Sequence, residues 1–416
     1  MIKRFLLILA VFLTVSMFAQ EGNSSPYSYY GIGLRNFTGT VENQAMGGIS
    51  ILGDSIHMNL QNPASFGALR LTNFTLGGSR KDVSLNSDGG KGTNTSTTLD
   101  YLALGFPIAK NMGAAFGLMP YTSVDYKIIN RDGELYERFM GRGGLNKAFV
   151  SWGYEFLQGV RVGGTVSYNF GNIRREVVQN NSNQQFGIQE INRSDISGIS
   201  FNLGLQAERA ITENIKIYGS ASYSPESNIN AENNREIATV IVSPVSDAVS
   251  SPVESLTPER TRTDFNLPSE YKLGLGLGEP NKWFAGAEYT GLQASQFTNP
   301  SYSLQNVSYD NDSQFRLGGF YIPRFNSITS YWDRIVYRAG FRYQETGLNI
   351  NGIGINEFGI SFGLGLPVGR TFSNANLSFE YGQRGTKNAG LIREDFFKVG
   401  LSLSLNDKWF VPFKFN

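Results

Sequence analysis

The residues best suited to catalysis lie together in one short stretch. Asp54, Ser55 and His57 offer the three side-chain types of a hydrolytic triad, and His57 is the only histidine in the chain. A triad needs its nucleophile and base to meet at hydrogen-bonding geometry, which two residues two positions apart in a flexible, glycine-rich segment rarely achieve. We therefore predict no catalytic residues and no enzyme activity.

Metal and polyanion binding are equally poorly supported. The chain has no cysteine and a single histidine, so it lacks the side chains that transition metals prefer. Its acidic and asparagine-rich segments show no EF-hand-like spacing for calcium. The 36 basic and 35 acidic residues nearly cancel, which argues against a nucleic-acid partner. We predict neither a metal site nor a cofactor.

The N-terminus has the three parts of a secretory signal peptide. Lys3 and Arg4 precede an apolar run from Phe5 to Phe18, and the small residue Ala19 follows. We expect residues 1–19 to be removed on export. No later segment supplies the roughly 18 consecutive apolar residues of a membrane-spanning helix. An exported chain without cysteine fits the bacterial envelope.

Most of the remaining chain alternates between apolar and small or polar residues. In one example near the C-terminus, the apolar positions are Val399, Leu401, Leu403 and Leu405, and the positions between them are Gly400, Ser402 and Ser404. Successive side chains of a strand point to opposite faces. This pattern fits a strand with lipid on one face and a polar, glycine-lined lumen on the other.

The number and spacing of these segments predict an all-β fold, a closed transmembrane antiparallel β-barrel of about 14 strands. Tight connections follow the second, fourth, sixth and eighth segments, whereas the intervening ones are long and polar. This asymmetry places short turns in the periplasm and long loops outside. A soluble sandwich or propeller is the structural alternative. The predicted strands are centred near Phe74, Leu102, Phe116, Trp152, Val166, Leu203, Gly219, Leu275, Ala287, Leu317, Ala339, Phe362, Phe379 and Leu401.

The stretch from Gln44 to Leu69 lacks this alternation and reads as short helical pieces and turns. Its "AMGG-x-S-x-x-x-D" pattern, followed by "NPA", resembles the N-terminal plug of FadL-like outer-membrane transporters of hydrophobic compounds. PorV-like shuttle barrels share this plug. The resemblance implies a plug at residues 20–68 inside a barrel at residues 69–416. Its motif residues are Gly47, Gly48, Asp54, Asn62, Pro63 and Ala64.

The same resemblance implies a side exit through the wall. In FadL-like barrels the third strand is kinked inward, and here Pro120 interrupts the third predicted strand, where a missing backbone donor would break the ladder. Gly117, Pro120 and Tyr121 are the candidate lateral exit. In the alternative interpretation, Pro120 lies above the hydrocarbon zone, where the strand enters a loop.

The longest outer connection, residues 224–266, is a candidate for ligand capture. It carries an apolar streak amid polar residues, and exposed apolar surface on a loop often marks a binding site. The resemblance points the same way, because outer loops shape a hydrophobic groove in FadL-like barrels. An alternative is that the streak packs onto the barrel mouth as a lid. The candidate residues are Val240, Ile241, Val242 and Val245.

Two functions follow from this sequence. The first is passive uptake of a hydrophobic small molecule, such as a long-chain fatty acid, across the outer membrane, with capture at outer loops and lateral release. The second is a structural or accessory barrel that binds a partner protein in an outer-membrane complex. The segments "YWDRIVYRAGFRY" and "EYGQRGT" resemble Bacteroidota members of the family. A contiguous apolar pocket above the plug would favour transport, and a lumen filled with salt bridges would favour the accessory barrel.

Overall fold

A computed structural model describes residues 25–181, 183–243, 248–250, 252–293, 306–368 and 373–408. The predicted signal peptide and Val245 lie outside these ranges. Among the described residues, no helix is long and apolar enough to cross a membrane.

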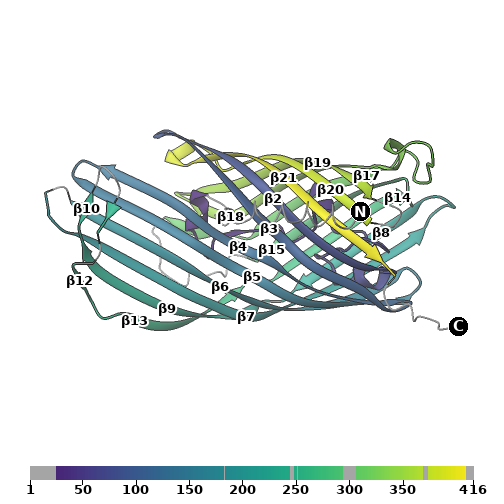
Figure 1. Ribbon diagram of the computed structural model, residues 1–416, viewed down its shortest axis with the longest axis horizontal. Coiled ribbons are helices and arrows are strands. Elements are labelled where there is room, and N and C mark those ends of the chain that lie inside the picture. The colour runs from purple at the N-terminus through teal and green to yellow at the C-terminus, as the bar shows by residue number, and fades with distance from the viewer. Residues whose placement is uncertain are drawn as a thin grey trace, which may run out of the picture.

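Fourteen antiparallel strands form a closed transmembrane β-barrel, as the sequence predicts (Figure 1). The barrel closes because β2 pairs with both β3 and the last strand, β21. Two of the fourteen strands are interrupted by prolines, Pro225 between β8 and β9 and Pro268 between β13 and β14. The wall consists of β2 (Thr72–Ser87), β3 (Gly90–Ala109), β4 (Met112–Asp132), β5 (Leu135–Leu157), β6 (Val160–Asn181), β7 (Gly187–Ala210), β8 (Lys216–Ser224) with β9 (Ser227–Val240), β13 (Glu259–Leu267) with β14 (Glu270–Glu279), β15 (Trp283–Leu292), β17 (Asp312–Tyr321), β18 (Val336–Ile350), β19 (Ile353–Val368), β20 (Ser373–Arg384) and β21 (Arg393–Asp407).

The alternation of the sequence matches the two faces of the wall. On β7, Phe201 and Leu203 are about half exposed and face outward, whereas Gln206 is buried in the lumen. On β19, Phe362 is 59% exposed and its neighbour Ser361 only 2%. The outward apolar belt is the surface that a bilayer would cover, so the barrel spans a membrane.

The predicted long outer loops are the main error of the sequence analysis. The β2–β3 and β4–β5 connections are two-residue turns, because the polar segments continue as strands beyond the membrane belt. Within residues 224–266, β9 and β13 pair with each other, and β9 also pairs with β7. Figure 1 shows β5, β6, β7, β9 and β13 running far beyond the rest of the barrel. These extensions read as loops because most of their outward-facing residues are polar.

Smaller elements complete the fold. A short hairpin of β10 (Val242–Ser243) and β11 (Ala248–Val249) lies at the far tip, and β12 (Glu254–Ser255) pairs with β9. β16 (Val307–Tyr309) pairs with β18. Two 3₁₀ turns, η5 (Trp332–Arg334) and η6 (Asn388–Gly390), lie in connections.

The segment that precedes the wall, residues 25–71, packs against the lumenal side of the strands, where Figure 1 shows it in purple. We call it the N-terminal segment. It contains η2 (Pro26–Tyr29), β1 (Leu34–Arg35), α2 (Val41–Ala45) and η3 (Pro63–Ala68). α2 begins with a capping box between Thr40 and Asn43. It contacts β18 to β21, while η3 contacts β3 to β7.

Candidate functional site in the barrel lumen

Wall glycines form a cradle for the first part of the plug motif. Gly47 and Gly48 have positive φ angles, 68° and 89°, so the chain turns sharply after α2. A Cβ added at Gly340 would lie 2.0 Å from the Gly47 nitrogen, and one added at Gly318 would lie 2.0 Å from the Met46 carbonyl oxygen. The N–H of Gly47 also donates to Ser361 Oγ at 3.0 Å. Only glycine at these wall positions lets the segment approach so closely.

A second cradle receives the "NPA" part of the motif. Added Cβ atoms at Gly163 and Gly204 would lie 2.4 Å from the Pro63 carbonyl carbon and 2.2 Å from Asn62 Oδ1. Asn62 caps η3 by accepting from the Ala64 N–H at 3.1 Å. Its amide donates to the carbonyls of Leu205 at 3.2 Å and Ala221 at 3.3 Å. One asparagine thus begins the turn and ties it to two wall strands.

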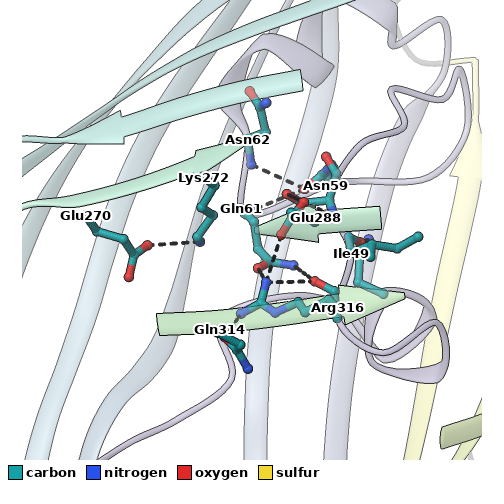
Figure 2. Close-up of polar contacts among 12 residues, drawn as sticks. Ile49, Asn59, Gln61, Asn62, Glu270, Lys272, Glu288, Gln314 and Arg316 are labelled. Atoms are coloured by element: carbon teal, nitrogen blue, oxygen red, sulfur yellow. Dashed lines mark hydrogen bonds and ion pairs between the residues drawn. The ribbon is translucent and has the colours of Figure 1, made fainter. Parts of the chain in front are cut away.

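A buried ion pair fastens the segment between the two cradles (Figure 2). Arg316 Nη1 lies 2.9 Å from Glu288 Oε1, and both side chains are almost fully buried. Glu288 accepts from the Ser50 N–H at 2.8 Å and from its hydroxyl at 2.7 Å. Arg316 donates to the Gly48 carbonyl at 3.0 Å. Each partner of the pair therefore binds the N-terminal segment.

A larger ionic network lies on the β18–β21 side of the lumen. Arg342 bridges Glu357 and Glu380, with Arg342 Nη2 2.7 Å from Glu380 Oε1. Arg384 pairs with Glu357 and also with Glu394, at 3.3 Å to Glu394 Oε2. Two residues of the N-terminal segment join this network: Gln44 donates to Glu380 at 2.8 Å, and Ser25 donates to Glu394. Its carboxylates are thus paired or hydrogen-bonded, as buried charges require.

Above the segment lies a cavity of about 300 Å³. Its lining includes apolar side chains such as Tyr121, Leu292 and Phe396, but charges of both signs interrupt them. The charged lining residues include Lys81, Asp100, Glu270, Lys272, Arg342, Glu357, Arg384 and Lys398. Such a lining solvates ions and water better than a hydrocarbon chain.

Asp54 and His57 meet near the first residues of β2 and β20. His57 Nδ1 lies 2.6 Å from Asp54 Oδ2, and His57 Nε2 lies 3.1 Å from the amide of Asn374. Burial disfavours the charged forms of both side chains, but the attraction between Asp54 and His57 is stronger than this effect. The pKa of Asp54 is lowered to about 2 and the pKa of His57 is raised. Within the described ranges, no cluster of three metal-binding side chains is present.

The wall separates between β3 and β4 at the level of Pro120. The two strands pair only from Leu102↔Leu118 towards their shared turn, so among the described strands β2 is the one partner of residues 90–101 of β3. Gly117 lies within the closed part, paired with Ala103 and Phe149. Tyr121 forms a bulge against β5, with Lys147 Nζ 4.2 Å from its ring centroid.

The N-terminal segment occupies the edge of β4 that β3 leaves. β1 pairs with β4 through Leu34↔Ser123, the Asn36 N–H donates to the Tyr121 carbonyl at 2.9 Å, and the Ser25 N–H donates to the Asp125 carbonyl at 3.0 Å. Residues 25–36 therefore replace β3 as the neighbour of β4. The sequence analysis missed this role, because a short glycine- and tyrosine-rich stretch carries no periodicity that reveals its pairing.

The candidate capture residues at the tip have different environments. Val240 and Val242 are buried in a small cluster with Tyr136 and Val178, and Ile241 is 45% exposed. The streak therefore packs largely on the sheet extension itself, far along the strands from the lumenal cavity.

Further ion pairs of the lumen are Arg161 with Glu208 and Lys216 with Glu208, at 3.3 Å each. The sequence analysis did not identify Glu357, Arg384 and Glu394, because these residues lie several positions from the predicted strand centres.

One family model, BamG, matches residues 1–416, the whole chain. The chain belongs to the BamG family. Solved structures similar to this BamG-family barrel include a hydrocarbon channel and a toluene transporter. The CymD monoaromatic hydrocarbon channel has a TM-score of 0.61 and 14% identity, covering 90% of this chain and 99% of that one. The toluene transporter TodX from P. putida has a TM-score of 0.61 and 15% identity, covering 90% and 100%.

A Pseudomonas aeruginosa FadL homologue has a TM-score of 0.59 and 13% identity, covering 90% of the BamG-family chain and 98% of its own. The FadL-like resemblance predicted from the plug motif is thus confirmed at the level of the fold. These structural neighbours are channels and transporters, not enzymes. No curated protein matches the chain.

Proposed function

We propose that this barrel is an accessory outer-membrane subunit that binds a partner protein, with a lumen sealed by the N-terminal segment as a plug. The main support for this proposal is the charged lining of the lumen. Ion pairs such as Arg316–Glu288 and Arg342–Glu380 bind the N-terminal segment there. A hydrophobic ligand that moved past these groups would desolvate the charged side chains and separate their ion pairs. This costs several kcal/mol for each buried charge. The family name BamG also suggests a subunit of a protein complex.

The free strand edge of β3 is the surface we propose for the partner. Residues 90–101 hydrogen-bond to β2 on one side, while β1 occupies the edge of β4 that would otherwise receive them. An unpaired edge of this length is a template for an added strand from another chain. Its threonine-rich sequence contains no proline that would block pairing.

This proposal is tested by photo-crosslinking in cells. A photoreactive residue at Thr93 or Thr97 of β3 should trap one protein of defined mass, while the same residue at the lipid-facing Phe362 should trap none. Equal labelling at all three positions, or none at β3, would count against the edge as a docking surface.

A second candidate function, passive uptake of a hydrophobic small molecule such as a long-chain fatty acid, rests on two observations. The fold is shared with hydrocarbon channels, and β3 and β4 separate at the predicted lateral exit. In this scheme a ligand is captured at the outer extensions, reaches the cavity and leaves beside Pro120 when residues 25–36 move. Proteoliposomes should then take up a labelled fatty acid faster than liposomes containing a cross-linked Leu34→Cys/Ser123→Cys barrel. Equal rates would exclude this route.

A further inference from the structure

Three arginines lie side by side on the outward face of the strand extensions. The register pairs Arg142 of β5 with Arg174 of β6, and Arg174 with Arg193 of β7. Directly opposed residues of antiparallel strands share a face, with Cβ atoms about 5 Å apart. Arg142, Arg174 and Arg193 have the same parity as the lipid-facing Val150, Tyr168 and Ile199 of their strands, so all three side chains point away from the lumen.

Neighbouring carboxylates neutralise only Arg193, at one end of this row. Asp195 pairs with Arg193, at 3.0 Å between Oδ1 and Nη2, and Glu176 pairs with Arg138 at 2.7 Å. Glu232, farther along the same face, pairs with Arg262. Within the residues that the structure describes, Arg142 and Arg174 have no ion pair, and both side chains are exposed. Like charges directly opposite each other destabilise a sheet. The arrangement therefore favours an anion between the two guanidinium groups.

The level of the row identifies the kind of anion. On β6, Arg174 follows Phe170 by four residues, about 13 Å along a strand at roughly 3.3 Å per residue. Tyr168 and Phe170 stack on the outward face, with ring centroids 5.8 Å apart, and Tyr168 is 51% exposed at the edge of the lipid belt. A ligand at this place meets aromatic surface below and cationic surface above. That combination fits a lipid headgroup better than a free ion.

We propose that Arg142 and Arg174, with the paired Arg193 beside them, bind the phosphate of a phosphorylated lipid in the outer leaflet. Guanidinium groups suit this role because they donate two parallel hydrogen bonds to phosphate oxygens. The acyl chains would lie along the outward surface of β5, β6 and β7 (Figure 1). This site is independent of the proposed partner edge on β3.

The test is native mass spectrometry of the detergent-solubilised barrel with diphosphoryl lipid A as the probe. Wild-type protein should retain lipid A, and the Arg142→Gln/Arg174→Gln variant should bind it at least ten-fold more weakly. The control Arg235→Gln/Arg262→Gln removes two exposed, paired arginines of the same extensions and should bind as wild type does. Phosphatidylcholine should not discriminate between the proteins.

Equal lipid A binding by wild type and the Arg142→Gln/Arg174→Gln variant would overturn the proposal. The same holds if inorganic phosphate at the lipid's concentration displaces lipid A fully, because the site would then recognise phosphate without its lipid. A heat-modifiability gel on each variant shows whether the barrel is folded. This control excludes misfolding as the cause of weaker lipid A binding.

Discussion

Arg316 Nη1 lies 2.9 Å from Glu288 Oε1 inside the lumen, and each partner also binds the backbone of the N-terminal segment. The pair therefore joins β15 and β17 to the segment at one point. We predict that Glu288→Gln destabilises the barrel by about 3–5 kcal/mol, because it leaves the arginine charge buried without its partner. Urea unfolding followed by tryptophan fluorescence measures the change. The control Arg262→Gln, at an exposed pair, should cost at most about 1 kcal/mol.

The glycine cradle gives a second prediction, which concerns the seal. Gly340→Val should expel the segment from its seat, because even the first added carbon would lie 2.0 Å from the Gly47 nitrogen. We expect single-channel conductance in planar bilayers to rise from near zero to steady openings. Gly219→Ala is the matched control, since its added carbon meets only Leu275 Cδ2 at 3.8 Å. A closed Gly340→Val barrel that is folded on gels would show that the segment does not depend on this contact.

His57 gives a pH prediction with a defined sign. Its pKa is raised by Asp54, so the pair stabilises the fold below the ordinary histidine pKa near 6.5, and this contribution is lost as pH rises through the folded-state pKa. His57 is the only histidine of the chain, so its imidazole signals in an NMR titration need no assignment. We expect a midpoint above 6.5 that drops in Asp54→Asn. An unchanged midpoint in that variant would remove Asp54 as the cause.

The topology is open to a labelling test. A cysteine at Ile241, at the far tip of the extensions, should react with a membrane-impermeant maleimide on whole cells, because Ile241 is 45% exposed. A cysteine at Lys110, in the β3–β4 turn, should react only after the outer membrane is opened. The native chain has no cysteine, so each label reports one position. Reversed reactivity would place the extensions in the periplasm.

The strands of the wall were predictable because lipid imposes an alternating pattern that can be read along a single strand. Phe201 and Leu203 show it, and all fourteen predicted centres lie in wall strands. The extensions lack this apolar alternation, because their outward-facing residues, such as Asn228 and Asn230, are in contact with water and not with lipid. Which strands they pair with is determined by their neighbours in the sheet. The alternation of residues within one strand does not reveal these partners.

Much of the candidate site was hidden for the same reason. The sequence marked Gly47, Gly48 and Asn62 as a motif, but the wall glycines that receive them, such as Gly340 and Gly204, come from strands far away in the chain. The β3–β4 separation and the role of residues 25–36 likewise depend on register. Pro120 was a sound marker of the place where the strand pairing changes, because proline cannot donate to the ladder.

The proposed role is tested most directly by native mass spectrometry of the protein gently extracted from its own outer membrane. An accessory barrel predicts a complex in which this chain carries one stoichiometric protein partner. It also predicts that collisional release of the barrel yields no hydrophobic molecule retained in the lumen. A lone barrel that releases a fatty-acid-like ligand, whose binding is lost when the lumenal cavity is blocked, would contradict the account and establish transport in its place.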